Sequence, residues 1–393
     1  MVEILNTEIK TRIEMINKGE VPEGYKKTKV GIIPENWEVK RLGEIAEIIS
    51  GGTPSTTVET YWDGEIPWCT PTDITSSSKY IENTTRYISS EGLNNSSAQL
   101  LPTNSILMCS RATIGPRSIN KIPMTTNQGF KSFVCKEDEL YFEFLYYVLE
   151  IYVPIFIKKS NGSTFLEISK RDTQKTEVAV PRLSEQQKIA QILSTWDQAI
   201  ELKEKLIEEK KQQKKGLMQK LLTGEVRLAG FDGEWEEVRL GDIVKRFKGK
   251  AVDYDKNGNY PVIGIEYFET GIFENYSNDN TVIATEKDVL ILWDGANAGK
   301  AFTSIKGIVG STFVNLECKN VNNIYLQKHL ELNEKFIMNI REGSGIPHVP
   351  KDFLSFYTLN LPSLQEQKAI AQILTTADKE IELLNQELEQ LKL

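Results

Sequence analysis

The chain has 393 residues, 40% hydrophobic and 26% charged, which is typical of a folded protein with more than one domain. The net charge is -8, and acidic residues outnumber basic ones in both halves, by 18 to 14 in residues 31–180 and 19 to 14 in residues 230–361. These numbers exclude a protein that coats nucleic acid through overall positive charge. No apolar run approaches the ~20 residues of a membrane span, and the N-terminus lacks a signal-peptide core, so we expect a cytoplasmic protein.

Cysteine and histidine are too sparse and too scattered for a structural metal site. The four cysteines, Cys69, Cys109, Cys135 and Cys318, form no CxxC pair, and the only histidines are His329 and His348. We therefore expect free thiols and no metal site in the chain.

Residues 1–18 are predicted to form an amphipathic helix that ends at Gly19. Residues 15–21 resemble residues 217–226, with the sequence Gly-Glu-Val shared by both. We interpret residues 1–20 as an N-terminal helix that completes the repeat found at the C-terminus. The alternative is a helix that packs elsewhere.

Two similar segments each open a domain. Asn36 starts NWEVKRLGEIAEI and Glu234 starts EWEEVRLGDIVKR, at an offset of 198 residues. Behind each segment, short apolar runs separated by Gly, Asn, Ser and Thr predict strands. The runs are SILMC, KSFVC and TEVAVP in the first domain, and YPVIG, DVLILW and FVNLE in the second.

One helical segment follows in each domain, at residues 139–157 and 323–340. Each is followed by a Gly-Ser loop, from Ser160 and from Arg341, and the loop glycines Gly162 and Gly343 differ by 181 positions. The loops therefore belong to a repeated unit, and we interpret them as a contact surface, with a plain connector as the alternative.

The clearest repeat is a long helical pattern. Residues 181–202 match residues 362–383 at 14 of 22 positions, again with an offset of 181. Apolar residues every three or four positions in both copies predict a coiled-coil seam, although the first copy carries Lys203, Lys210 and Lys214 in its middle. Ser184 and Ser363 are the expected helix caps. A helix over residues 185–222 has 38 residues, or about 57 Å.

Sequence motifs for catalysis are weak. GANAGKA from Gly295 has three residues between its glycines where a phosphate-binding loop needs four, and Ala301 replaces the metal-binding hydroxyl. PENWEVK from Pro34 resembles a metal-nuclease motif, but its only upstream acid, Glu35, is too close to lie on a separate strand. No Asn-Pro-Pro-aromatic motif of amino-methyltransferases occurs. We therefore expect a non-catalytic protein.

Several loops carry side chains suited to DNA bases. SRATIGPR, residues 110–117, holds two arginines, whose guanidinium groups fit guanine O6 and N7, and TTNQGFK, residues 125–131, holds an Asn and a Gln, whose amides fit adenine. WDGANAGK, residues 293–300, and VGSTF, residues 309–313, lie at corresponding places in the second domain. The candidate DNA-binding residues are Thr53, Arg111, Thr113, Arg117, Asn127, Gln128, Ser163, Thr164, Lys250, Asp294, Asn297, Lys300, Ser311, Thr312, Ser344 and His348.

Together these motifs resemble the specificity subunits of type I restriction-modification enzymes, over essentially the whole chain. The resemblance rests on the W-E-x-x-x-L-G-like openings, on P-x-L-x-E-Q-x-x-I-A-x-I-L before each long helix, and on residues 49–68 and the base-reading loops. The chain departs from the family pattern in its second domain, which has Asp294-Gly295 in place of Ser-Arg and Gly310-Ser311 in place of Asn-Gln. The resemblance implies that each domain recognises one half of a bipartite, asymmetric double-stranded DNA site.

The expected fold is α+β, with two α/β target recognition domains separated by an antiparallel pair of long coiled-coil helices in a pseudo-two-fold arrangement. The expected parts are residues 1–20, the first domain at 21–182, the central helix at 183–228, the second domain at 229–363 and the C-terminal helix at 364–393. The resemblance implies that the helices set the spacer and bind two methyltransferase subunits, with restriction subunits as further partners. S-adenosylmethionine, ATP and Mg²⁺ are expected in those partners. The alternatives are a coiled-coil scaffold that does not bind DNA and a methyltransferase with an unrecognised motif.

Overall fold

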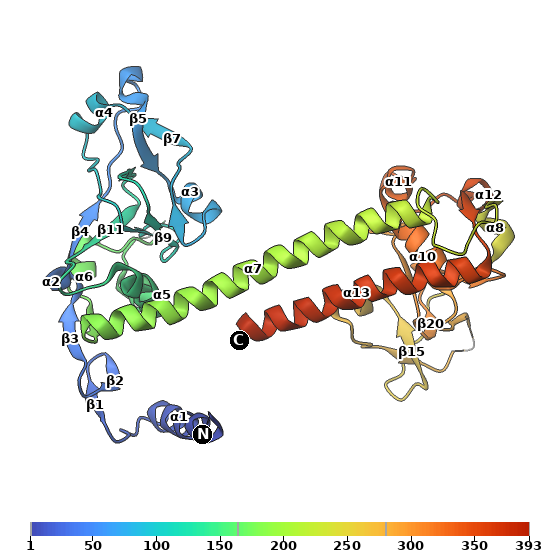
Figure 1. Cartoon of the computed structure of the whole chain (residues 1–393), viewed down its shortest axis with the longest axis horizontal. Coiled ribbons are helices and arrows are strands. Elements are labelled where there is room, and N and C mark those ends of the chain that lie inside the picture. Colours follow the sequence, from blue (N-terminus) through green and yellow to red (C-terminus); the bar gives the residue numbers. More distant parts are fainter. Residues whose placement is uncertain (1, 163–164, 280, 393) are drawn as a thin grey trace. The chain divides into compact units, whose positions relative to one another are not determined.

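The computed structural model describes residues 2–162, 165–279 and 281–392. The chain divides into two compact units, residues 1–198 and 199–393, and the division falls within the long helix α7 (Leu183–Leu222). Each unit holds one mixed α/β domain, which we call domain 1 (residues 21–182) and domain 2 (residues 229–363) (Figure 1). None of the helices in the described residues is long and apolar enough to cross a membrane.

Domain 1 is built on a five-stranded sheet of order β4-β11-β8-β9-β6 and a three-stranded sheet of order β10-β5-β7. The five-stranded sheet consists of β4 (Ala46–Ser50), β11 (Phe130–Cys135), β8 (Ile106–Cys109), β9 (Arg117–Asn120) and β6 (Tyr80–Ile81). The three-stranded sheet consists of β10 (Thr125–Thr126), β5 (Trp62–Cys69) and β7 (Arg86–Ile88). Two strand pairs complete unit 1, β1 (Tyr25–Thr28) with β2 (Gly31–Pro34) and β3 (Glu38–Arg41) with β12 (Glu177–Val180).

The helices of unit 1 lie between and beside these strands. They are α1 (Val2–Asn17), α2 (Leu42–Ile45), η1 (Glu59–Tyr61), α3 (Pro71–Ser76), α4 (Ser90–Asn94), α5 (Phe142–Lys159) and α6 (Lys170–Gln174). The buried side of α5 packs with the five-stranded sheet and with Ile189 and Ala190 at the start of α7. In α1, Ile9 and Ile13 are 46% and 52% exposed. The role of residues 1–20 as the complement of the C-terminal repeat stays a prediction.

Domain 2 repeats this plan with fewer elements. One four-stranded sheet has the order β14-β21-β18-β19, formed by β14 (Val244–Lys248), β21 (Phe313–Cys318), β18 (Val289–Leu292) and β19 (Ala301–Thr303). The second has the order β16-β15-β20-β17, formed by β16 (Tyr276–Ser277), β15 (Tyr260–Ile263), β20 (Gly307–Val309) and β17 (Ile283–Ala284). β13 (Glu236–Arg239) pairs with β22 (Thr358–Leu361). The helices of domain 2 are α8 (Leu240–Ile243), α9 (Ile265–Thr270), α10 (Asn323–Leu332), α11 (Glu334–Asn339) and α12 (Phe353–Phe356), and α13 (Leu364–Lys392) follows the domain in unit 2.

The internal repeat predicted from the sequence is confirmed by this strand order. β4-β11-β8-β9 in domain 1 and β14-β21-β18-β19 in domain 2 are the same arrangement, and each domain also has a parallel pair, β5 with β10 and β15 with β20. All six predicted apolar runs form strands. The helix predicted at 323–340 is in fact two helices, because the chain leaves helical geometry at Asn333, where φ is -96° and ψ is 11°.

The repeated opening segment has a packing reason. In both domains it forms a short strand followed by one helical turn, β3 with α2 and β13 with α8. Leu42 and Leu240 in these turns are completely buried. A Cβ at Gly43 would lie 3.0 Å from the side chain of Gln174, and one at Gly241 would lie 3.1 Å from the carbonyl oxygen of Leu354. Glycine therefore allows the turn to lie close against its neighbour.

The predicted coiled-coil seam is confirmed within unit 2, where the end of α7 runs antiparallel to α13 (Figure 1). Ile207 and Leu221 of α7, and Ile370 and Leu374 of α13, are buried. The three seam lysines form ion pairs with acidic residues of α13: Lys203 with Glu387, Lys210 with Glu380 and Lys214 with Asp378. The middle of the seam is therefore polar and paired.

The two helix caps differ from the prediction in one respect. Ser363 precedes α13, and its hydroxyl accepts a hydrogen bond from the Glu366 amide at 3.3 Å, as expected. The prediction for Ser184 is wrong, because α7 begins at Leu183 and Ser184 lies in its first turn. The offset of 181 places Arg182, not Ser184, at the position equivalent to Ser363.

Candidate nucleic-acid interface

Four separate segments of domain 1 meet at one end of its five-stranded sheet. They are the end of β4, the β8–β9 turn, the β10–β11 turn and the loop after α5. The backbone of Ser110 joins two of them, since its amide donates to the Gly129 carbonyl at 2.8 Å and its carbonyl accepts from the Ile168 amide at 3.1 Å. The Ala112 amide donates to the Leu166 carbonyl at 2.9 Å. We call these four segments the platform of domain 1.

Domain 2 builds the same platform with the equivalent backbone bonds. The Trp293 amide donates to the Thr312 carbonyl at 2.8 Å, and the Val349 amide donates to the Trp293 carbonyl at 2.9 Å. The Gly295 amide donates to the Pro347 carbonyl at 2.8 Å. The platform of domain 2 thus consists of the end of β14, the β18–β19 turn, the β20–β21 turn and the loop after α11.

Glycine is required where each turn passes over a helix. Gly115 has φ of 120°, and a Cβ there would lie 2.9 Å from the Val153 side chain. Gly299 has φ of 104°, and a Cβ there would lie 2.9 Å from the Ile337 side chain. Positive φ and the close helix both disfavour any residue with a side chain. Glycine at these two positions therefore allows each turn to pack closely against its helix.

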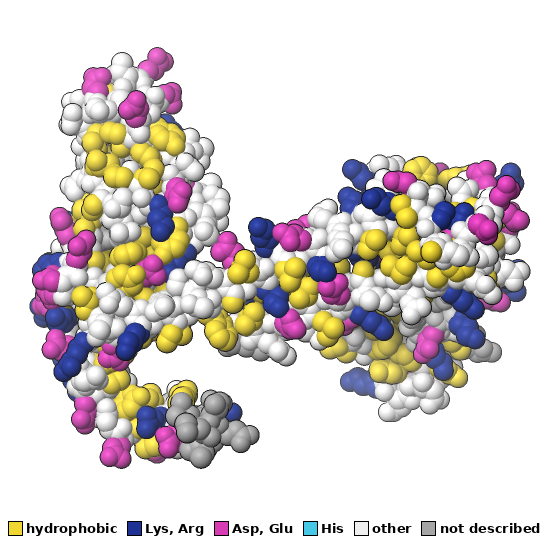
Figure 2. Space-filling view, viewed as in Figure 1, with side chains coloured by type: hydrophobic (Ala, Val, Ile, Leu, Met, Phe, Trp, Pro, Cys, Tyr) yellow, Lys and Arg dark blue, Asp and Glu magenta, His cyan; other side chains and the backbone are white. Residues whose placement is uncertain are grey.

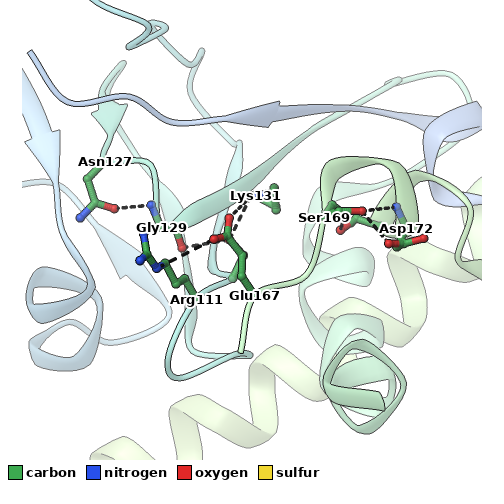
Figure 3. Close-up of polar contacts among 9 residues, drawn as sticks. Arg111, Asn127, Gly129, Lys131, Glu167, Ser169 and Asp172 are labelled. Atoms are coloured by element: carbon green, nitrogen blue, oxygen red, sulfur yellow. Dashed lines mark hydrogen bonds and ion pairs between the residues drawn. The ribbon is translucent and has the colours of Figure 1, made fainter. Parts of the chain in front are cut away.

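An ion-pair cluster occupies the centre of the domain 1 platform (Figure 3). Glu167 lies between two cations, with 3.9 Å from its Oε2 to Arg111 Nε and 3.2 Å from its Oε1 to Lys131 Nζ. The Lys131 side chain is only 5% exposed, whereas that of Arg111 is 47% exposed. Glu167 thus contacts the Nε edge of the Arg111 guanidinium, and the exposed side chain is oriented by a partly buried carboxylate.

Amide side chains stand next to this cluster. The Asn127 Oδ1 accepts a hydrogen bond from the Gly129 amide at 2.8 Å, so the turn itself orients the Asn127 amide (Figure 3). The Thr53 hydroxyl, just beyond β4, donates to Gln128 Oε1. These contacts bring Arg111, Asn127, Gln128 and Thr53, four residues proposed from the sequence, onto one platform.

The centre of the domain 2 platform has different side chains. Lys248 at the end of β14 lies 2.5 Å from the Asp294 carboxylate, measured from Nζ to Oδ2. The backbone of Asp294 pairs with that of His348, and His348 Nε2 lies 3.8 Å from Glu342 Oε2. The Arg341 guanidinium donates to the Ala296 carbonyl at 2.6 Å. Asp294 and His348 are therefore brought together. The backbone bridges place Asp294 at the position of Arg111, so the sequence comparison that set Asp294-Gly295 in place of Ser-Arg is wrong by one residue.

The other candidates fall into four groups. Thr113, Lys250, Asn297, Ser311 and Ser344 are exposed, while Lys300 and Thr312 are half-buried. Arg117 is different, since its side chain is 8% exposed and its guanidinium donates to Glu150, to the Tyr146 carbonyl and to the Gly115 carbonyl. These contacts of Arg117 stabilise the turn and leave its guanidinium little exposed. Ser163 and Thr164 lie outside the described residues.

Sequence reasoning missed Glu167, Lys131 and Lys248. Glu167 could have been found, because the offset of 181 pairs it with His348. The two lysines depend on strand pairing, which places Lys131 opposite Ser50 and Lys248 opposite Val314. That pairing is not visible in the sequence.

The platforms offer hydrogen-bond donors and acceptors rather than reactive groups. Cys109 lies directly below the β8–β9 turn, but burial raises the pKa of its thiol to about 12, so the thiol stays protonated at neutral pH. Among the described residues, no group of three or more His, Cys, Asp or Glu side chains is placed to hold a metal ion. On the face shown in Figure 2, basic and acidic side chains are interspersed, so binding would depend on local contacts.

The chain matches the family model described as the type I restriction modification DNA specificity domain, over residues 34–212 and 232–393. It is 33% identical over 270 residues to the MjaIX specificity subunit of Methanocaldococcus jannaschii, covering 63% of this chain and 62% of that protein. It is 42% identical over 164 residues to the MjaVIII specificity subunit of the same organism, covering 40% and 39% of the two chains. The matched region is thus less than two thirds of either relative.

Two solved structures share the fold over nearly the whole chain. The type I restriction-modification S subunit from M. genitalium superposes with a TM-score of 0.59 at 17% identity, covering 91% of this chain and 93% of that one. A structure described as the basis of complex assembly and conformational transition of the type I R-M system gives a TM-score of 0.60 at 18% identity, covering 92% and 95%.

Proposed function

The chain belongs to the family of type I restriction modification DNA specificity domains, and from this premise we propose that it is the sequence-recognition subunit of such a system. Each domain recognises one half of a bipartite double-stranded DNA site. The two halves differ in sequence because the platform side chains differ between the domains.

One observation supports this proposal above all others. The two platforms share their backbone hydrogen bonds, yet the side chains at their centres are unrelated: Arg111 and Glu167 in one, Asp294 and His348 in the other. A fixed backbone with variable polar side chains on loops is the arrangement expected of a recognition surface. A scaffold protein would have no need of repeated polar platforms.

We further propose that the chain carries no catalytic centre and that methyl transfer is performed by partner subunits. Two methyltransferase subunits would bind the long helices, and S-adenosylmethionine would be their cofactor. Restriction subunits using ATP and Mg²⁺ would complete the assembly.

A gel shift on a duplex library with randomised sequence tests sequence recognition. The purified chain, alone or with its methyltransferase partner, is expected to enrich particular sequences from the library. Binding without enrichment, or no binding in either form, would favour the scaffold alternative. Incubating the chain alone with labelled S-adenosylmethionine and DNA tests the enzymatic alternative, and we expect no methyl transfer.

A further inference from the structure

The centres of the two platforms carry opposite charges at equivalent positions. Arg111 follows β8 as Asp294 follows β18, and the backbone of each forms an isolated antiparallel bridge to the last residue of its loop, Glu167 or His348. A second bridge closes each loop, between Asn161 and Glu167 in domain 1 and between Glu342 and His348 in domain 2. The turn position thus holds a cation in domain 1 and an anion in domain 2.

In each platform one lysine pairs with the carboxylate, and the position of that lysine differs between the domains as the position of the carboxylate does. In domain 1 the carboxylate is on the loop, and Lys131 of β11 reaches it. In domain 2 the carboxylate is on the turn, and Lys248 of β14 reaches it. β4 pairs with β11 as β14 pairs with β21, so the two lysines occupy neighbouring strands at the same level of the sheet. In both platforms a lysine of the sheet thus pairs with the carboxylate, and domain 1 carries Arg111 as a second cation. We call the replacement of a cation by an anion at the turn position the charge exchange.

The exchange changes which chemical groups the turn presents. Arg111 is 47% exposed, and its Nε edge faces Glu167, so its terminal amino groups are the donors presented outward. Asp294 is 36% exposed and presents carboxylate oxygens, which only accept hydrogen bonds. A carboxylate repels phosphate, so Asp294 facing DNA would be favourable only against a donor on a base edge.

We propose that these two turn residues determine one base in each half-site, with opposite hydrogen-bond patterns: Arg111 recognises a guanine through O6 and N7, and Asp294 recognises a cytosine through its N4 amino group. In the major groove, an arginine fork matches the two guanine acceptors, and an aspartate matches the cytosine donor. Glu167 and Lys248 are positioning residues that orient the two side chains. This inference rests on the proposed function.

The test is selection of bound duplexes from a randomised library by the wild-type chain in complex with its methyltransferase partner, repeated with Arg111→Gln and Asp294→Asn. For Asp294→Asn we expect one base pair of one half-site to change from cytosine toward adenine, because an amide fits adenine N6 and N7. For Arg111→Gln we expect the guanine preference at one position of the other half-site to fall by roughly tenfold or more. The remaining positions should be unchanged in both variants.

Matched controls carry the same chemical change on an exposed residue away from the platforms. Arg171→Gln on α6 is the control for Arg111, and Asp242→Asn on α8 is the control for Asp294. Neither control should alter any base preference. Thermal unfolding of all four variants shows whether each is folded, and a variant that fails to fold is replaced by Arg111→Ala or Asp294→Ser, for which loss of the same base preference is expected.

The outcomes separate this inference from the proposed function. If the wild-type complex enriches no sequence, the proposed function fails. If it enriches two half-sites but both variants keep every base preference, or lose affinity equally for all sequences, the proposed function stands and this inference is overturned. Equal loss for all sequences would identify the turn residues as phosphate contacts.

Discussion

Single residues in domain 2 show how burial sets protonation. His329 on α10 packs beside Tyr357, with 3.1 Å between its Nδ1 and the tyrosine hydroxyl oxygen. Burial lowers the pKa of His329 to about 4, because the charged imidazolium would lose its hydration. In the unfolded chain the same histidine titrates near pH ~6.5. The unfolded state therefore binds more protons than the folded state between these two pH values.

From this difference we predict that the free energy of unfolding falls as the pH is lowered from about 7 to about 5. The part due to His329 is on the order of 1 to 2 kcal/mol, and it is lost progressively below the unfolded pKa. Urea unfolding at the two pH values measures it. His329→Gln, which does not titrate, should show a smaller decrease over the same interval. An equal decrease in both proteins would mean that His329 does not stay neutral when folded.

The sequence predicted which residues lie on the platforms better than it predicted whether each side chain is exposed there. Arg111, Asn127 and Asp294 were expected at the recognition surface from their place in Gly-containing turns, and they lie on the two platforms. Arg117 has the same sequence setting as Arg111, yet the chain path buries it against Glu150. The two arginines of this turn differ because Arg111 lies on its exposed part, whereas Arg117 lies where the chain returns to the sheet. That distinction depends on tertiary packing, which the local sequence does not encode.

At the scale of the elements, the ion pairs of the α7–α13 seam are the least expected feature. Lys214 contacts both Asp378 and Glu331 and is 15% exposed. Burial alone would lower the pKa of Lys214, but the bonds to Asp378 and Glu331 outweigh it and raise the pKa. Lys328 contacts the same two carboxylates, so four charges balance at the base of the seam.

We predict that Lys214→Met destabilises unit 2 by about 2 kcal/mol or more, because it leaves two half-buried carboxylates with a single cation. Lys203→Met is the matched control, since Lys203 occupies an equivalent seam position but pairs with Glu387, which is 57% exposed. Its cost should stay below about 1 kcal/mol. Thermal or urea unfolding of the two variants compares them. Similar stability of both would show that the paired carboxylates at the base of the seam are solvated.

The secondary structure predicted from the sequence is correct where the pattern of apolar residues alone determines it. The short apolar runs form strands, and the segments with apolar residues every three or four positions form α7 and α13. The errors lie where local signals competed with tertiary context. Ser184 resembles a cap, which would start the helix at residue 185, but α7 starts two residues earlier, at Leu183. The helix predicted at 323–340 breaks at Asn333.

For the whole molecule, the duplicated sequence is the most informative signal. An offset of 181 relates two helices and two loops along the chain, and the loops form equivalent parts of the two platforms. The offset does not predict the charge exchange between platforms, because Lys131 and Lys248 lie on different strands and are related only through sheet pairing.

The long helix makes a prediction about the distance between half-sites. α7 has 40 residues, or about 60 Å of helix. We propose that its length sets the spacer, so deleting residues 200–206 should shorten the spacer by roughly three base pairs, from about 10.5 Å of helix and about 3.4 Å per base pair. Because seven residues are one coiled-coil repeat, the deletion keeps the same side of α7 facing α13 and keeps the ion pairs of Lys210 and Lys214.

Sequencing the duplexes bound by the deletion variant measures the new spacer. Both half-sites should be unchanged. A control in which residues 200–206 are replaced by another seven-residue coiled-coil repeat should keep the original spacer. If the deletion leaves the spacer as it was, or changes the half-sites, the helix does not act as the ruler.

The most direct test of bipartite recognition is the architecture of the DNA site selected by the wild-type complex from a fully randomised duplex library. We expect two short specified blocks of different sequence, separated by unspecified positions of fixed number. A single continuous block, two identical blocks or the absence of any enriched sequence would contradict recognition of two different half-sites by the two domains.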